Sequence, residues 1–93
     1  MTVLGTDVLL EAMGKHADLR GPGASWLKIA SAARWKSLVE VRKTWRDTDF
    51  IDPETCFNVK GNRYRLWALV NYGAQTIIIT RIETHAQYGK KKV

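Results

Sequence analysis

The sequence is poor in cysteine, since Cys56 is the only one among 93 residues. A single cysteine excludes an intrachain disulfide and any zinc site that needs several thiolates. Long hydrophobic runs are also missing, because no aliphatic run is longer than Ile77–Ile79, whereas a membrane-spanning helix needs about 20 apolar residues. The first residues lack the basic stretch and the apolar core of a secretory signal. We therefore expect a cytoplasmic protein that is not inserted in a membrane.

Acidic residues are scarce in the C-terminal part of the chain. Residues 1–54 carry eight basic and eight acidic side chains, whereas residues 55–93 carry seven basic side chains and only Glu83. The whole net charge of +6 therefore lies in the second segment. Such asymmetry indicates a polyanionic partner, with nucleic acid first and an anionic membrane second. The alternative is a solubilising surface with a lysine tail.

The length and composition are those of one globular domain over residues 1–93. In the first half, apolar residues recur at the three- and four-residue spacing of helices. A short strand or lead-in is predicted over Met1–Gly5, followed by a helix from Thr6 or Asp7 to Ala17 and a breaker loop at Arg20–Gly23. Ser25 is predicted to cap a second helix, and a capping box of Ser37 and Glu40 is predicted to start a third. A connection is predicted over Asp47–Pro53.

From Thr55 onward the apolar spacing changes to 2, which indicates strands. Strands are predicted over Thr55–Lys60, Arg63–Tyr72 and Gln75–Ile82, with tight turns at Gly61-Asn62 and Gly73-Ala74. Helices followed by a run of strands favour an α+β domain. We expect N-terminal helices packed on one face of a small twisted, mainly antiparallel sheet.

The alternation assigns side chains to the two faces of this sheet. The side chains that should face the helices are apolar: Phe57, Val59, Leu66, Ala68 and Val70. The side chains that should lie on the opposite face are Lys60, Arg65 and Trp67. No Asp or Glu occurs between Thr55 and Ile82, so the second face is predicted to be basic. An ordinary solvated sheet face is the alternative.

The four tryptophans divide in the same way. Trp26, Trp35 and Trp45 occupy helical positions and are predicted to lie in the core. Trp67 lies on the basic face, where its ring is suited to stack on a nucleotide base.

The residues after the last strand suit phosphodiester chemistry. His85 and Tyr88, together with Lys60 and Arg65, offer groups for proton transfer and for stabilising phosphorane charge. RNA carries its own nucleophile, the 2′-hydroxyl, so such a reaction needs no metal. No metal or cofactor motif is present, and His16 is remote from His85 in the sequence.

Two stretches, Phe57–Leu66 (FNVKGNRYRL) and Thr84–Tyr88 (THAQY), give the sequence a resemblance to the HigB toxins of bacterial toxin–antitoxin systems, within the RelE-like mRNA interferase superfamily. The likeness extends over nearly the whole chain. It implies a compact RelE-like α+β toxin, an endoribonuclease that cuts mRNA on the translating ribosome. It also implies a helix-turn-helix antitoxin, similar to HigA, as partner.

The resemblance implies roles for particular residues. Lys60, Arg65, His85 and Tyr88 are the expected catalytic residues, with Arg65 at the scissile phosphate. Further contacts to the RNA are expected from Asn58, Asn62, Arg63, Trp67, Arg81 and Lys90. Two positions depart from the family pattern, since Gly89 stands where many relatives carry aspartate and Arg81 is offset by one residue.

Two other classes of function fit the charge pattern. One is a non-catalytic module that binds RNA or DNA, and the other is an interaction protein whose basic face meets an acidic partner. Only the nuclease would leave mRNA with new 5′-hydroxyl ends.

Overall fold

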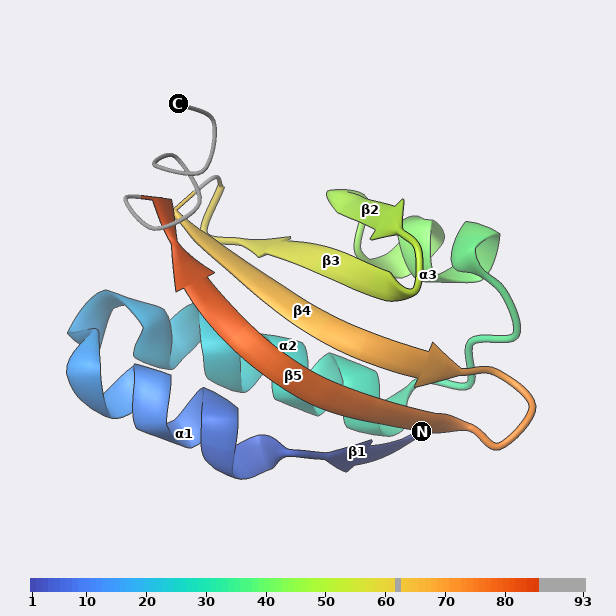
Figure 1. The fold of residues 1–93 in the computed structure, drawn as a ribbon, viewed down its shortest axis with the longest axis horizontal. Helices are drawn as coiled ribbons and strands as arrows, with labels where there is room; N and C mark the ends of the chain where they lie inside the picture. Colours follow the sequence, from blue (N-terminus) through green and yellow to red (C-terminus); the bar gives the residue numbers. More distant parts are fainter. Residues whose placement is uncertain (62, 86–93) are drawn as a thin grey trace.

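The computed structural model describes residues 1–61 and 63–85, and their order of elements is that of an α+β domain (Figure 1). The elements are β1 (Thr2–Leu4), α1 (Thr6–Lys15), the 3₁₀ helix η1 (Ala17–Leu19), α2 (Arg20–Ala32), α3 (Leu38–Thr44), β2 (Thr48–Ile51), β3 (Glu54–Val59), β4 (Tyr64–Asn71) and β5 (Thr76–Thr84). Within these residues no helix has the length and apolar character to cross a membrane.

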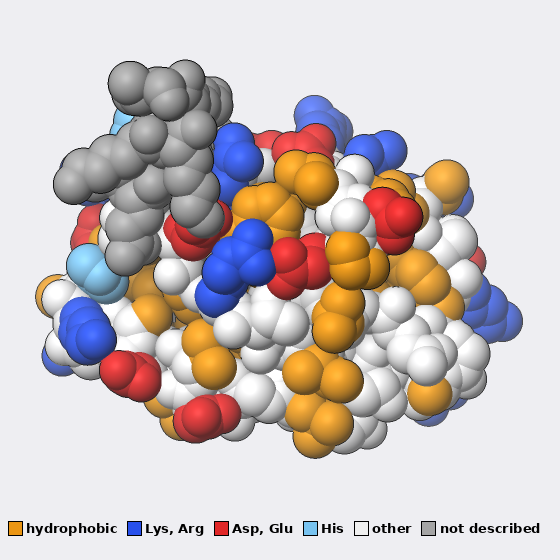
Figure 2. Space-filling model, viewed as in Figure 1, with side chains coloured by type: hydrophobic (Ala, Val, Ile, Leu, Met, Phe, Trp, Pro, Cys, Tyr) orange, Lys and Arg blue, Asp and Glu red, His pale blue; other side chains and the backbone are white. Residues whose placement is uncertain are grey.

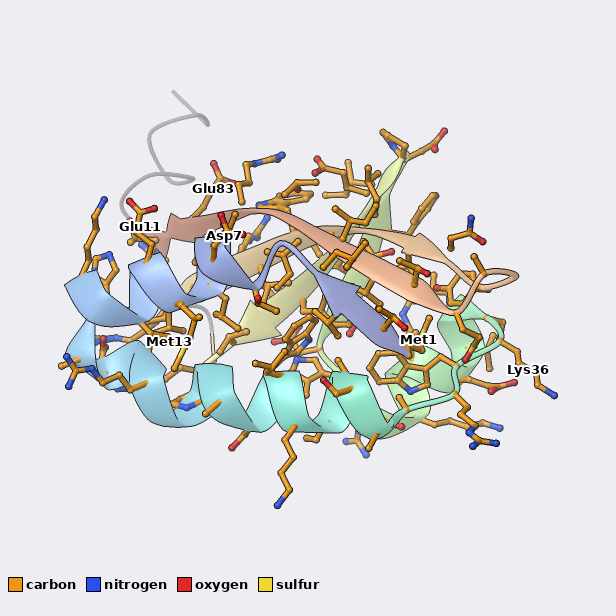
Figure 3. The ribbon with its side chains drawn as sticks, turned by 90° about the horizontal axis from the view of Figure 1, so that it is seen from below. Met1, Asp7, Glu11, Met13, Lys36 and Glu83 are labelled. Carbon is orange, nitrogen blue, oxygen red and sulfur yellow. The ribbon has the colours of Figure 1, made fainter. Side chains whose placement is uncertain are left out.

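The described strands form one sheet in the order β1-β5-β4-β3-β2. β1 runs parallel to β5, and the other neighbouring strands are antiparallel. Helix α2 lies along one side of the sheet, and side chains fill the space between them (Figure 3). We call the opposite side the open face. The predicted architecture, helices on one face of a mainly antiparallel sheet, is confirmed.

The core lies between α2 and the sheet, as the alternation of apolar residues predicts. Phe57 and Val59 of β3 pair with Leu66 and Tyr64 of β4, and all four side chains are buried. The ring of Phe57 contacts the indole of Trp26 edge-to-face, with 5.2 Å between ring centroids. Ala68 and Trp35 also lie in the core, as predicted, whereas Val70 and Trp45 are only partly buried.

The predicted breaker loop at Arg20–Gly23 is wrong, because these residues form the first turn of α2. Proline is tolerated there, since the amides of a first turn have no intrahelical acceptor. Gly23 is buried, and a Cβ at this position would lie 3.2 Å from Met13 Sδ and 3.3 Å from Leu9 Cδ1. The glycine therefore lets α1 and α2 approach closely, and Ser25 lies inside α2 rather than at its N-cap.

Other boundaries are partly as predicted. Ser37 caps α3, accepting a hydrogen bond from the Glu40 amide at 3.4 Å. The N-cap of α1 is Gly5 rather than Thr6 or Asp7. The segment Asp47–Pro53 contains a strand, β2, which pairs antiparallel with β3.

A bulge in β5 changes which side chains lie on the open face. Ala68 pairs with Ile79 and Trp67 pairs with Arg81, so Thr80 is an extra residue on β5. Ile79 faces the core before the bulge, and without the extra residue Arg81 would face the core as well. The bulge instead places Arg81 on the open face, beside Trp67.

Gly5 tests how closely the start of α1 must approach the sheet. Gly5 has φ of 73°, and a Cβ there would lie 2.5 Å from the backbone oxygen of Ile79. We expect Gly5→Ala to lower the free energy of unfolding by about 1–3 kcal/mol, measured by urea denaturation.

Gly14 provides the matched control, because a Cβ there meets no atom within 4 Å. Gly14→Ala should raise the free energy of unfolding by up to about 1 kcal/mol, through helix propensity. An unchanged urea midpoint for Gly5→Ala would contradict the close packing of β1 and α1 against β5.

Candidate functional site

One carboxylate gathers three donors at the end of the sheet where β3 turns into β4. Asp18 of η1 lies 3.3 Å from Lys60 Nζ and 3.3 Å from Arg63 Nη1, both measured to its Oδ2 atom. The hydroxyl of Tyr64 donates a hydrogen bond to Oδ1 of the same carboxylate. We call this region, formed by η1, the β3–β4 turn and the end of β5, the hairpin end.

The contacts at the hairpin end fix the ionisation of two groups. The hydrogen bond from Tyr64, followed by the contacts of Lys60 and Arg63, holds the pKa of Asp18 below its ordinary value of 3.8, although burial acts in the opposite direction. Burial, together with the hydrogen bond to Asp18, raises the pKa of Tyr64 above 10.0. Around neutral pH the pair is therefore a carboxylate and a protonated phenol.

Lys60 does not share the open face with Arg65 and Trp67, so this part of the predicted arrangement is wrong. Strand β3 ends at Val59, and Lys60 takes a positive φ of 55° in the turn. The strand alternation stops there, and the ammonium group reaches Asp18 on the helical side. Gly61 also has a positive φ, of 64°, as predicted for this turn.

A shallow pocket opens at the hairpin end. It has a volume of about 330 Å³, and its lining residues are His16, Arg63, Tyr64, Thr84 and His85. The ring centroids of His16 and Tyr64 lie 5.4 Å apart. The backbone amide of His85 donates a 2.8 Å hydrogen bond to the carbonyl of Arg63, which anchors the residue after β5 to the hairpin. The pocket thus brings together the two histidines that are remote in the sequence.

Arg65 and Trp67 lie on the open face, as predicted, among residues of the neighbouring strands. Arg65 pairs with Asn58 on β3 and with Glu83 on β5. The Trp67 indole is only 7% exposed and donates a 2.7 Å hydrogen bond to Glu83 Oε1. The guanidinium carbon of Arg81 lies 4.4 Å from the ring centroid. The indole is therefore covered, which argues against the predicted role of Trp67 as an open platform for a base.

Carboxylates balance the charge of Arg81 on this face. Its Nη1 atom lies 2.8 Å from Glu54 Oε1, and its Nε atom lies 3.9 Å from Glu83 Oε1. Glu54 and Glu83 come directly before and after the segment Thr55–Ile82, which has no acidic residue. Both carboxylates contact Arg81 within that segment. Figure 2 shows basic and acidic side chains next to one another on this side of the molecule. The prediction of a basic face without carboxylates is therefore wrong.

The remaining predicted site residues fall into two groups. Asn58 is buried, and its Nδ2 atom donates a 2.9 Å hydrogen bond to Asp47 Oδ1, so its side chain supports the fold. Asn62, Tyr88 and Lys90 lie outside the described residues, and their roles stay predictions.

Outside the hairpin end, we find no second reactive centre among the residues that the structure describes. Burial raises the pKa of the Cys56 thiol to about 11, so the thiolate is scarce at neutral pH. Among residues 1–61 and 63–85, no three His, Cys, Asp or Glu side chains are grouped so that they could hold a metal ion.

Comparison with known families identifies the class of protein. Residues 21–91 match the model of the HigB_toxin family, described as the RelE-like toxic component of a toxin-antitoxin system. The match covers more than half of the chain, so this protein belongs to the HigB toxin family and is the toxin of a toxin–antitoxin pair. Membership implies an antitoxin partner. No curated protein matches the chain.

Glu54 offers a test of the ion-pair network on the open face. Hydrogen bonds from Thr80 and then Arg81 hold the pKa of Glu54 below its ordinary value of 4.5, against the effect of burial. Because the folded state has the lower pKa, this stabilisation is complete above pH 4.5 and is lost as the pH falls through the folded pKa. Glu54→Gln should lower the free energy of unfolding at about pH 7 by about 1–2 kcal/mol.

The same variant should lose less stability than the wild type between about pH 7 and about pH 3, measured by urea denaturation. Glu11→Gln is the control, because Glu11 forms an exposed ion pair with Lys15 at 3.2 Å. Its effect should stay within about 1 kcal/mol. Equal acid sensitivity in Glu54→Gln and the wild type would show that the network does not stabilise the fold.

Proposed function

We propose that this toxin is an endoribonuclease that cuts mRNA on the translating ribosome, without a metal, through attack of the RNA 2′-hydroxyl on the adjacent phosphate. Membership in a RelE-like toxin family supports this proposal. The observation that carries it is the arrangement of the hairpin end. His85 and Arg63 line the same pocket, and Lys60 contacts the same carboxylate, Asp18, as Arg63.

The reaction needs three kinds of group. A base takes the proton of the 2′-hydroxyl, an acid protonates the departing 5′-oxygen, and cations stabilise the charge that grows on the phosphorane. In this proposal His85 transfers a proton and Arg65 stabilises the phosphorane charge, with Lys60 and Tyr88 as the other catalytic candidates. Arg65 directly follows Tyr64 at the start of β4, so it lies at the edge of the open face that adjoins the hairpin end.

The partners follow from the same proposal. The substrate is mRNA held by the ribosome in the cytoplasm. The antitoxin is a helix-turn-helix protein similar to HigA, which blocks the toxin and represses the operon. The alternative function is a non-catalytic module that binds RNA or DNA, which the positive charge of residues 55–93 would also support.

Cleavage distinguishes the nuclease from the binding module. Controlled expression of the wild type in a bacterium, followed by mapping of mRNA ends on ribosomes, should show new 5′-hydroxyl ends. Arg65→Ala should lower the cleavage rate by about 100-fold or more at every pH tested, because a guanidinium stays charged throughout. Arg34→Ala, which removes an exposed arginine elsewhere, should cut like the wild type. Intact transcripts with the wild type would favour the binding module.

Asp18 should limit the affinity for free RNA, because its carboxylate already engages Lys60 and Arg63. We expect weak binding of a short RNA whose 2′-hydroxyls are methylated, with affinity that falls as salt rises. Asp18→Asn should raise this affinity more than Asp7→Asn, which removes the same charge from the exposed first turn of α1. Fluorescence anisotropy over a range of salt concentrations measures both. Equal gains in the two variants would mean that only net charge matters.

A further inference from the structure

We propose that His16 is a second proton-transfer group of the hairpin-end pocket and that it works as a pair with His85 on the bound RNA. The inference rests on the proposed ribonuclease function and deepens it. It comes from the pocket itself, in which the fold places both imidazoles although η1, α2, α3 and the strands from β2 to β5 separate them in the sequence.

Both histidines are placed by the ends of secondary-structure elements. His16 lies between α1 and η1, with extended backbone angles of φ −128° and ψ 98°. His85 directly follows β5 and is tied to the hairpin through its backbone amide. The pocket between them, of about 330 Å³, falls in the usual range of small-molecule sites, about 300–1,000 Å³.

The ring of Tyr64 packs against the ring of His16 in the pocket. The two rings meet at an interplanar angle of 56°, and the phenol of Tyr64 is held by Asp18. Because burial and this hydrogen bond raise the pKa of Tyr64, its phenol stays protonated at neutral pH and is a poor base there. Imidazole is the side chain whose ordinary pKa is closest to neutral pH, so two imidazoles can supply both a base and an acid.

The charged and titratable groups around the imidazoles come from three directions. Glu11, Lys15 and Asp18 lie on the helical side, Arg63 lies in the β3–β4 turn, and Tyr64 and Arg81 lie on strands. Glu11 pairs with Lys15, and Asp18 is shared by its three donors. Lys60 and Arg63 sit beside the pocket as cations for a phosphate.

The proposed step conserves protons and needs no other reactant. One imidazole, in its neutral form, takes the proton of the 2′-hydroxyl while the 2′-oxygen forms a bond to phosphorus. The bond between phosphorus and the 5′-oxygen breaks, and the other imidazole, in its protonated form, gives its proton to that oxygen. The products are a 2′,3′-cyclic phosphate and a 5′-hydroxyl, and the two histidines have exchanged protonation states.

The pH profile of cleavage tests the pair. With saturating toxin on ribosomes that hold a defined mRNA, the wild type should show a bell-shaped dependence of rate on pH. His16→Ala and His85→Ala should each slow cleavage by about 10²- to 10⁴-fold, and each should lose a different limb of the bell. Lys15→Ala, next to His16 and exposed, should keep both limbs. Circular dichroism and urea denaturation verify that the variants are folded.

A measurement of phosphate binding tests whether His16 and His85 share a pocket without relying on cleavage. In an NMR titration of the wild type with inorganic phosphate, the imidazole signals of His16 and His85 should move together, and His16→Ala should reduce the shift at His85. Movement of His85 alone would contradict a shared pocket. If the wild type cuts and His16→Ala keeps both limbs at the wild-type rate, the pairing is wrong and the nuclease stands. If the wild type leaves mRNA intact, both proposals fail.

Discussion

The carboxylate of Asp18 is the constraint on which the hairpin end depends. It holds Lys60 and Arg63 of the turn and the phenol of Tyr64, and so ties η1 to a hairpin that lies far away in the sequence. The pKa of Asp18 lies below its ordinary value, so the carboxylate stays charged over the physiological range and the contacts persist. With Tyr64 fixed in this way, the pocket between His16 and His85 has a defined wall.

The bulge at Thr80 determines on which face of the sheet the charge of Arg81 lies. It moves Arg81 to the open face, where Glu54 and Glu83 balance it and where its guanidinium covers Trp67. On the open face Arg81 is paired with two carboxylates, whereas at the hairpin end Lys60 and Arg63 share one carboxylate, Asp18, beside the two imidazoles. This contrast is why we place the chemistry at the end of the sheet rather than across its surface.

Local patterns predicted what depends on neighbouring residues, and they failed where distant contacts decide. The alternation around Phe57 and the cap at Ser37 are properties of short segments, and both are confirmed. Arg20–Gly23 was predicted as a loop because its composition is that of a turn, yet packing of Gly23 against α1 makes it helical. No spacing in the sequence shows that His16 and His85 share a pocket or that Asp18 meets Lys60. The family resemblance is confirmed, but the expected roles of the site residues stay proposals.

The most direct test of this account is to locate bound RNA on the folded toxin. Backbone amide shifts can be mapped by NMR with a dinucleotide whose 2′-hydroxyl is methylated, so that it binds without being cut. The account predicts the largest shifts at residues 16–18, 60–65 and 84–85, around the hairpin end. Shifts confined to β1, β2 or the middle of the open face would contradict it, because the phosphate would then bind away from every group proposed to act on it.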